Sequence, residues 1–251
     1  MDLLQPAGAR SVLLLLASLV IPGTIAAQQS PRITQAIFGG DSAPVTPEIS
    51  THELQRILAE GRIPVLDVRS QQEYAIAHIP GSRNYYEKEL ELITQGFPDT
   101  SAKLVLYCNG PYCGKSRRLS EELVKRGYTG VVRYQLGMPV WRALGNTVQT
   151  DLAGMRYILA DDRTAVMVDA RSPEAFAKGT LPQAVNVRRG DVAAANEDGR
   201  LPNKDKGTRV VVFADTPEDA KAVAEEVARK AYWNSSYFGG TYADLAALAR
   251  Q

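Results

Sequence analysis

A segment in the first half of this chain returns in the second half, and this repeat constrains the fold more than any other feature. Residues 65–70 (VLDVRS) recur as residues 167–172 (MVDARS), at an offset of 102. Four further pairs match at this offset without a gap: Tyr74 with Phe176, Ile79 with Leu181, Pro80 with Pro182, and Asn84 with Asn186. So many matches at one offset indicate the duplication of a domain-sized unit.

The two units also share their order of apolar and helical segments. The short apolar runs 104–107 and 210–213 are typical of strands buried on both faces. In each unit a helical pattern, a strand-like run and a closing helix follow: 116–126, 131–134 and 140–144, then 217–230, 235–238 and 242–250. This order predicts an α/β fold of two tandem domains, each a mostly parallel β-sheet flanked by helices.

The length and charge of the chain narrow its class further. Its 251 residues divide into a unit at 46–150 and a unit at 151–251, with a linker expected near 149–157. Both units lie within the usual size range of a domain. The formal net charge is +1 and no basic block stands out, so neither a nucleic-acid partner nor an anionic membrane surface is favoured.

The first 27 residues have the order of a secretory signal. Arg10 precedes an apolar run, 12–21, interrupted only by Ser18, and the small-residue stretch that follows suits cleavage after Ala26 or Ala27. The run is too short for a helix of about 20 residues across a bilayer. We predict a signal peptide at 1–27, a flexible tether at 28–45, and a periplasmic or secreted protein with no stable membrane insertion after signal removal. An uncleaved anchor or a buried helix is the alternative.

The candidate catalytic residues lie at the end of the strand 104–107. Cys108 follows that strand, and a Gly/Pro-rich turn then leads into a helix. The free N–H groups and the dipole of a helix N-terminus favour an anion, so we expect a lowered pKa and a nucleophilic thiolate at Cys108. Lys115 adds positive charge, and Ser116 is the expected N-cap. The predicted substrate-binding loop comprises Asn109, Gly110, Pro111, Tyr112, Cys113, Gly114, Lys115 and Ser116.

Several motifs together resemble the rhodanese family. They are Asp67-x-Arg69, the segment 73–81 ending in His-Ile-Pro-Gly, Tyr-Cys at 107–108, Gly-Tyr at 127–128, and Gly137 with Trp141. The resemblance covers 46–150 well and 151–251 more weakly. It implies a sulfurtransferase of the thiosulfate type, in which Cys108 takes sulfane sulfur from a donor such as thiosulfate as a persulfide. A thiol or cyanide then accepts the sulfur. The resemblance implies no cofactor and no metal, and a supporting role for Asp67 and Arg69.

The loop departs from the family pattern. Cys113 stands five residues after Cys108, where the family has an arginine, and the loop is two residues longer than its counterpart in the second unit. A longer loop suits a bulkier substrate. A phosphatase of related fold is not favoured, because Lys115 stands where an arginine fork would be needed to bind phosphate.

Three roles are open for Cys113: a resolving thiol, a redox partner of Cys108, or a small apolar residue of the loop wall. Two cysteines supply only half of a zinc site, and we do not expect His78 to act as a base, because its counterpart is Thr180.

The second unit has Ala214 in place of the cysteine, followed by the acids Asp215, Glu218 and Asp219. It is expected to be catalytically silent and to shape a cleft or bind a protein partner. Besides sulfur transfer, an exported dithiol/disulfide redox protein and a non-catalytic binding module stay open.

Overall fold

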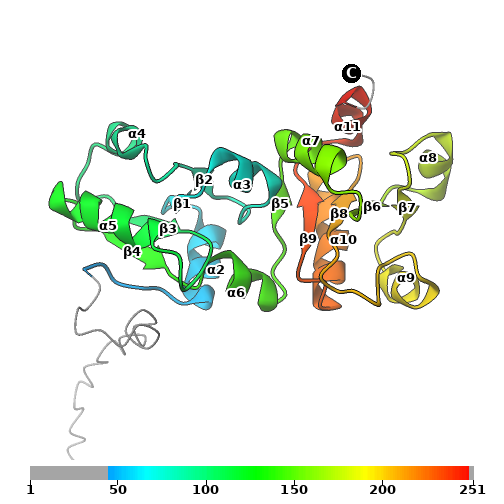
Figure 1. Cartoon of the computed structure of the whole chain (residues 1–251), viewed down its shortest axis with the longest axis horizontal. Coiled ribbons are helices and arrows are strands. Elements are labelled where there is room, and N and C mark those ends of the chain that lie inside the picture. Colours follow the sequence, from blue (N-terminus) through cyan, green and yellow to red (C-terminus); the bar gives the residue numbers. More distant parts are fainter. Residues whose placement is uncertain (1–44, 249–251) are drawn as a thin grey trace, which may run out of the picture.

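The computed structural model describes residues 45–248, and within them two α/β domains follow one another (Figure 1). The predicted signal peptide 1–27 and all of the tether but Val45 lie outside the described residues. Among the described residues, no helix has both the length and the apolar character to cross a membrane.

The first domain contains a sheet of four parallel strands in the order β2-β1-β3-β4. The strands are β1 (Val65–Asp67), β2 (Arg83–Asn84), β3 (Leu104–Tyr107) and β4 (Val131–Tyr134). The helices are α2 (Thr51–Glu60), α3 (Gln71–Ile76), α4 (Leu90–Gly96), α5 (Lys115–Lys125) and α6 (Gly137–Ala143). Glu48 adds an isolated parallel bridge to Arg133 beside β4.

Both faces of this sheet are buried, which explains why β3 is apolar at every position. Successive side chains of a strand point to opposite faces. Val105 and Tyr107 of β3 join the core cluster of one face, whereas Leu104 and Leu106 join the cluster of the other. Cys108 continues the second cluster and is 1% exposed. The alternation therefore turns Cys108 toward the face that α5 covers.

The second domain repeats this plan with five parallel strands in the order β5-β9-β8-β6-β7. The strands are β5 (Gln149–Thr150), β6 (Val166–Asp169), β7 (Val185–Asn186), β8 (Val210–Phe213) and β9 (Ser235–Phe238). The helices are α7 (Leu152–Asp161), α8 (Pro173–Lys178), α9 (Val192–Asp198), α10 (Pro217–Arg229) and α11 (Tyr242–Leu248). The prediction of two tandem domains with parallel sheets is confirmed.

The segment 149–157, expected as a linker, is instead regular structure. Gln149 and Thr150 form the edge strand β5, and most of α7 follows. Gln149 exchanges two backbone hydrogen bonds with His78 of the first domain, at 2.9 and 3.0 Å, while β5 also pairs with β9. This polar segment forms a strand because its backbone N–H and C=O groups find hydrogen-bond partners in both domains.

The two domains meet along α3 and α7, which pack against each other (Figure 1). The hydroxyl of Thr150 donates to the carbonyl oxygen of Ile76 at 2.8 Å, and the N–H of Asp151 donates to that of Ala75 at 2.8 Å. Gly154 lies so close to Ala75 that a Cβ would collide with its carbonyl group. Backbone contacts of this closeness fix the position of one domain on the other.

Candidate active site

The loop after β3 encloses the sulfur of Cys108. The Cys108 Sγ atom lies 3.3 Å from the Ser116 Oγ atom and 3.4 Å from the carbonyl oxygen of Cys113. The loop is held against α6, because Met138 donates its N–H to the carbonyl oxygen of Cys108 at 3.2 Å. The strand, the loop and the start of α5 therefore position the thiol together.

Ser116 does not cap α5, contrary to the prediction. The helix begins at Lys115, with Gly114 as its N-cap and no side-chain cap. Because the helix starts one residue earlier than predicted, Ser116 lies within its first turn and is fully buried. Its backbone N–H and its hydroxyl both contact the sulfur of Cys108 and favour the negative form of that sulfur.

The two thiols of the loop shift each other's pKa values in opposite directions. Cys113 is less buried than Cys108, and its sulfur accepts hydrogen bonds from the Cys108 thiol and from the N–H groups of Lys115 and Asn109. The Cys108 thiol is the main cause that lowers the pKa of Cys113, to about 6, against the opposing effect of burial. The same hydrogen bond, followed by burial, raises the pKa of Cys108.

The expectation of a lowered pKa at Cys108 is therefore wrong for the resting pair. Burial disfavours the charged form more strongly at Cys108 than at Cys113, so Cys113 is the thiol whose pKa is lowered, and the two thiols titrate as one coupled system.

A buried polar chain braces the loop from behind. Gln135 donates from Nε2 to the carbonyl oxygen of Pro111 at 2.8 Å, and Arg133 donates to Gln135. Arg133 is fully buried in β4 and forms an ion pair with Glu48 at 2.8 Å. Arg133 and Gln135 were not among the predicted site residues. The signal that could have found them was a charged residue inside the apolar run 131–134, which has to be paired when it is buried.

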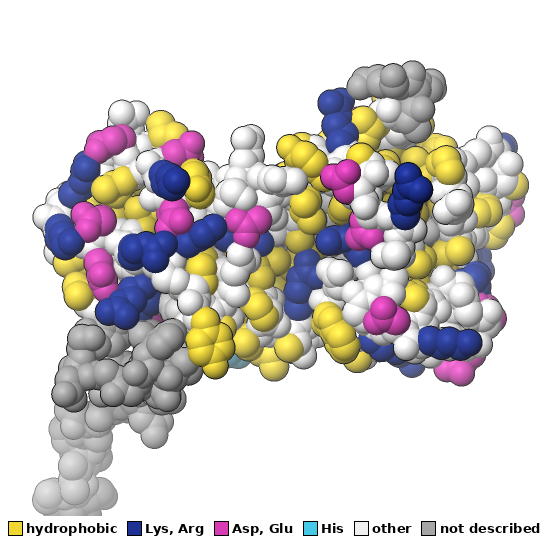
Figure 2. Space-filling model, in the orientation of Figure 1, with side chains coloured by type: hydrophobic (Ala, Val, Ile, Leu, Met, Phe, Trp, Pro, Cys, Tyr) yellow, Lys and Arg dark blue, Asp and Glu magenta, His cyan; other side chains and the backbone are white. Residues whose placement is uncertain are grey.

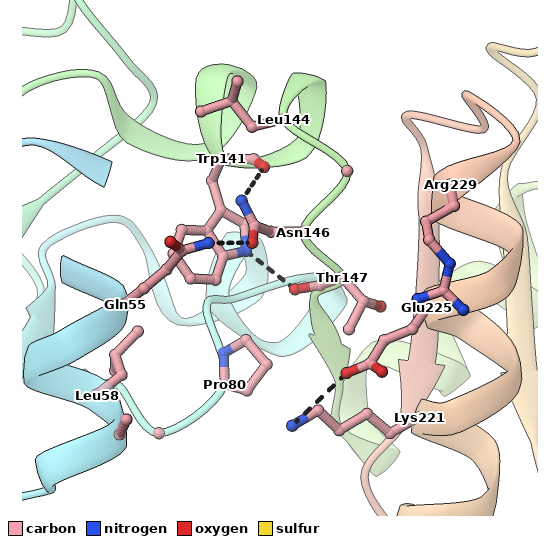
Figure 3. Close-up of a pocket in the computed structure, with 13 residues that line it drawn as sticks. Gln55, Leu58, Pro80, Trp141, Leu144, Asn146, Thr147, Lys221, Glu225 and Arg229 are labelled. Carbon is pink, nitrogen blue, oxygen red and sulfur yellow. Dashed lines mark hydrogen bonds and ion pairs between the residues drawn. The ribbon is translucent and has the colours of Figure 1, made fainter. Parts of the chain in front are cut away.

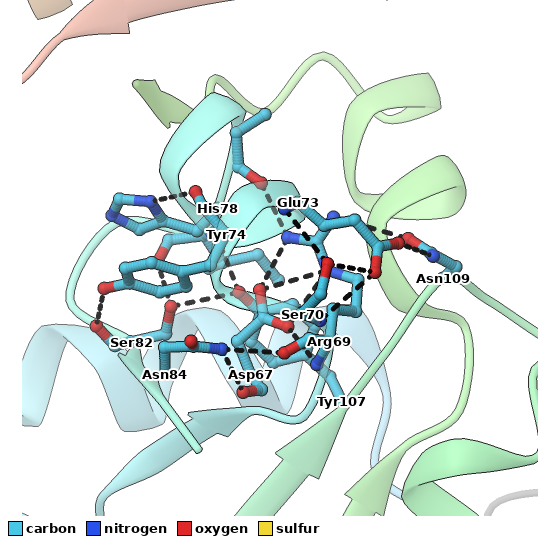
Figure 4. Close-up of polar contacts among 12 residues, drawn as sticks. Asp67, Arg69, Ser70, Glu73, Tyr74, His78, Ser82, Asn84, Tyr107 and Asn109 are labelled. Carbon is cyan, nitrogen blue, oxygen red and sulfur yellow. Dashed lines mark hydrogen bonds and ion pairs between the residues drawn. The ribbon is translucent and has the colours of Figure 1, made fainter. Parts of the chain in front are cut away.

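Asp67 and Arg69 form a buried ion pair next to the loop (Figure 4). The Arg69 guanidinium donates to Asp67 Oδ2 at 2.6 Å, to the carbonyl oxygen of Ala77 at 2.6 Å, and to Asn109 Oδ1 at 3.3 Å. The contacts of Asp67 are to Arg69 and the backbone around it. The pair joins the end of β1 to the residue that follows Cys108.

Glu73 contacts the loop too, although it was not among the predicted site residues. Its Oε1 atom accepts a hydrogen bond of 2.5 Å from Asn109 (Figure 4). Its Oε2 atom lies 3.4 Å from Lys115 Nζ. Burial opposes ionisation, but the hydrogen bonds from Asn109 and Ser70 and the charge of Lys115 outweigh it and lower the pKa of Glu73 to about 2. Glu73 therefore holds the side chain of Asn109 in place and forms an ion pair with Lys115.

The other residues of interest lie in different surroundings. Tyr112 extends from the loop and is 78% exposed. His78 is buried and stacks on Tyr74 at 3.8 Å between ring centroids, and burial lowers its pKa. Its Nδ1 atom is 2.9 Å from the carbonyl oxygen of Tyr74. These contacts give His78 a packing role at the domain junction.

The second domain keeps the scaffold of the site without its thiol. Arg171 pairs with Asp169 at 2.6 Å, as Arg69 pairs with Asp67. Ala214 occupies the cysteine position, and the carboxylate of Asp215 stands 4.0 Å from Arg171 where the first domain has Asn109. The side chain of Thr216 caps α10, so one N–H group that an anion would use is already bonded. Within residues 45–248, no group of three His, Cys, Asp or Glu side chains is arranged to hold a metal ion.

Cavities lie between the two domains, and one of them reaches the loop. A cleft of about 440 Å³ extends from Asn109 and Glu73 to Trp233 and Asn234 of the second domain. A cavity of about 710 Å³ lies between Trp141 and α10, and no residue of the loop 108–116 lines it (Figure 3). In its wall, Gln55 of α2 donates a hydrogen bond of 2.7 Å to Asn146, which follows α6. The smaller cleft is therefore the one that reaches Asn109, the residue next to Cys108.

Comparisons with known proteins agree with this architecture. A family model described as "Rhodanese-like domain" matches residues 50–144 and again 157–247. The chain is 33% identical over 112 residues to human thiosulfate:glutathione sulfurtransferase, covering 43% of this chain and 88% of that protein. It is 32% identical over 97 residues to thiosulfate sulfurtransferase GlpE of Ectopseudomonas mendocina, covering 38% and 84%. A crystal structure of thiosulfate sulfurtransferase from Pseudomonas aeruginosa aligns at 17% identity and a TM-score of 0.37, over 80% of this chain and 42% of that one.

Proposed function

The chain belongs to the family of rhodanese-like domains, and from that membership we propose that it is a sulfurtransferase that carries sulfane sulfur as a persulfide on Cys108. The observation that carries this proposal is the position of Cys108, at the end of β3 inside a loop whose N–H groups face the two sulfurs. The two sulfurtransferases that match part of this chain support thiosulfate as a donor. The second domain, which has no cysteine, is catalytically silent in this proposal.

In the first half-reaction, Cys108 attacks the outer sulfur of thiosulfate. The bond between the two thiosulfate sulfurs breaks, and sulfite leaves with the electron pair. Cys113 is the base, because its thiolate already accepts the hydrogen bond of the Cys108 thiol and takes that proton as the new bond forms. The N–H groups of Lys115 and Asn109 then stabilise the negative terminal sulfur of the persulfide.

In the second half-reaction, an acceptor thiolate attacks the terminal sulfur of the persulfide. A persulfide of the acceptor forms, and Cys108 leaves as a thiolate that regains the shared proton from Cys113. Both half-reactions are nucleophilic displacements at sulfur and need no external oxidant or reductant. Because the loop is longer than its counterpart in the second domain, we propose an acceptor larger than cyanide.

A dithiol/disulfide redox protein is the second candidate, favoured by the hydrogen bond between the two thiols. In this case Cys113 attacks the Cys108 sulfur of the persulfide. A disulfide between Cys108 and Cys113 forms, the sulfane sulfur leaves as hydrosulfide, and a dithiol reductant resets the pair.

Intact-mass spectrometry after incubation with thiosulfate separates the two candidates. We expect the wild-type protein to gain the mass of one sulfur, the Cys108→Ser variant to gain none, and the Cys113→Ser variant to gain one sulfur more slowly. The added sulfur should disappear when a thiol acceptor is supplied.

A loss of two hydrogens without a gain of sulfur, abolished by Cys113→Ser, would establish the redox candidate instead. If neither cysteine reacts, the protein is a binding module. Circular dichroism of each variant verifies that the serine substitutions leave the fold intact.

We further propose that the protein works in the periplasm or is secreted. The order of charge, apolar run and small residues within 1–27 supports this location. Cell fractionation with N-terminal sequencing of the recovered protein tests it. Cleavage after Ala26 or Ala27 is the expected result, and an uncleaved cytosolic protein would contradict the proposal.

A further inference from the structure

The cleft beside the loop is built from both domains. Its floor includes Asn109, the residue after Cys108, and Met138, whose N–H holds the Cys108 carbonyl. The second domain supplies the opposite wall through Arg209, just before β8, and through Trp233 and Asn234, just before β9. The amino-terminal edge of the second sheet therefore faces the loop of the first domain.

Three guanidinium groups line this cleft, and two of them are neutralised. Arg69 pairs with Asp67 at 2.6 Å, and Arg209 pairs with Asp162 at 2.9 Å. Arg142, on α6, lies near both. Figure 2 shows Lys and Arg side chains gathered along the junction of the domains on this face.

Arg142 has no carboxylate partner within residues 45–248. Its Nη1 atom donates to the carbonyl oxygen of Trp233 at 3.0 Å and to Asn234 Oδ1 at 2.9 Å, which are neutral acceptors. Burial, followed by the charges of Arg209 and Arg69, lowers the pKa of Arg142 to about 10. A charge held in this way is stabilised by an anion that enters the cleft.

The volume and the apolar lining of the cleft indicate which kind of anionic ligand fits it. Its volume of about 440 Å³ falls within the range of sites for organic ligands, about 300–1,000 Å³, rather than that of a bare inorganic ion. Ile76, Met138, Pro139 and Trp233 supply apolar surface next to Arg142. The cleft therefore suits a small organic acid.

We propose that this cleft binds the sulfur acceptor, a low-molecular-weight thiol that carries carboxylate groups, and that Arg142 binds its carboxylate. The identification of the ligand as the acceptor rests on the proposed sulfurtransferase function. It also gives the silent second domain a role, since Trp233, Asn234 and Arg209 complete the acceptor site.

The kinetic test compares a charged acceptor with a neutral one. With thiosulfate as donor, kcat/KM is measured for mercaptosuccinate and for thioglycerol in the wild type and in Arg142→Gln. We expect a loss of about tenfold or more for mercaptosuccinate, the size of one charge-assisted hydrogen bond, and little change for thioglycerol. Arg142→Lys should recover part of the loss.

The matched control is Arg229→Gln, which removes an exposed positive charge from α10 outside this cleft. It should leave both acceptors unchanged. An equal loss for both thiols in Arg142→Gln would show that Arg142 only joins the domains and would overturn the proposal. A loss confined to the thiosulfate half-reaction, followed by intact mass, would assign the anion to the donor and overturn it as well.

A binding measurement separates this proposal from the proposed function. Methylthiosuccinate has the carboxylates but no thiol, so it binds without reacting. We expect it to change the fluorescence of Trp233, which is 56% exposed in the cleft wall, and we expect Arg142→Gln to weaken this binding about tenfold or more. Binding without any uptake of sulfur on Cys108 would refute the sulfurtransferase and keep the anion site. Sulfur uptake with no binding of methylthiosuccinate would refute the site alone.

Discussion

The hydrogen bond between Cys108 and Cys113 shifts their pKa values in opposite directions, and burial adds to the shift at Cys108. Cys108 is 1% exposed and its pKa is raised, whereas Cys113 accepts the hydrogen bond and has a pKa lowered to about 6. Thiolates are the reactive form, so we expect iodoacetamide to alkylate Cys113 first, at a rate that rises with pH and is half-maximal near pH 6. Peptide mapping by mass spectrometry at several pH values measures both rates.

The cause of the lowered pKa of Cys113 provides a control for this prediction. Cys108→Ala removes the hydrogen bond that contributes most to lowering the pKa of Cys113, so the midpoint of alkylation should move to higher pH. An unchanged midpoint, or a Cys108 that reacts before Cys113 in the wild type, would contradict the assignment of the proton.

The sequence identified both thiols and the Asp67–Arg69 pair but not how they are held. Arg133 and Gln135 carry no motif, and their role follows from the ion pair to Glu48, 85 positions earlier in the chain. The order of the two pKa values could not be predicted either, because it depends first on the hydrogen bond between the two thiols and then on the burial of each sulfur.

At the scale of elements, the loop and α6 are coupled through Gly137. Its φ is +60°, and a Cβ there would collide with the Cys108 carbonyl and the Gly110 amide. Gly137→Ala should therefore destabilise the fold by more than the roughly 1–2 kcal/mol that positive φ alone costs, and should slow persulfide formation. Chemical denaturation and intact mass after brief exposure to thiosulfate measure the two effects.

Gly61 offers a matched control for this prediction. It follows the end of α2 with a φ of +65°, and nothing lies within 4 Å of the position that an alanine methyl group would take there. Gly61→Ala should cost only the backbone strain and leave persulfide formation unchanged. Equal effects of the two substitutions would show that the contact between α6 and the loop does not matter.

The elements that the sequence predicted best are the strands at the centre of the two sheets. The strands 104–107, 131–134, 210–213 and 235–238 coincide with β3, β4, β8 and β9. The clearest cases are β3 and β8, which are apolar and buried at every position and so leave few alternatives. The edge strand β5 was missed, since Gln149 and Thr150 are polar and are held by backbone partners from both domains. Edge strands are specified by their neighbours rather than by their own pattern.

At the scale of the whole molecule, the repeat predicted two domains but not how they dock. The cleft unites Arg69, Arg142 and Arg209, which lie in separate segments with no shared motif. Duplication alone would allow the silent loop around Ala214 to face the active one, whereas the structure places the amino-terminal edge of the second sheet there. The contacts of α3 with α7 hold this arrangement in place.

Docking therefore depends on the close approach of α7 to α3 at Gly154. A glycine-to-alanine change inside a helix ordinarily stabilises it by about 1 kcal/mol, but here the added Cβ would collide with the backbone of Ala75. We expect Gly154→Ala to lower the Tm and to loosen the domains, seen as a larger radius of gyration in small-angle X-ray scattering. It should also reduce kcat/KM for a carboxylate-bearing acceptor more than the rate of persulfide formation.

Ala153→Gly, at an exposed position of the same helix, is the control, because it loses helix propensity of about 1 kcal/mol without changing the junction. A higher Tm in Gly154→Ala would mean that helix propensity outweighs the contact, and that the domains do not depend on it.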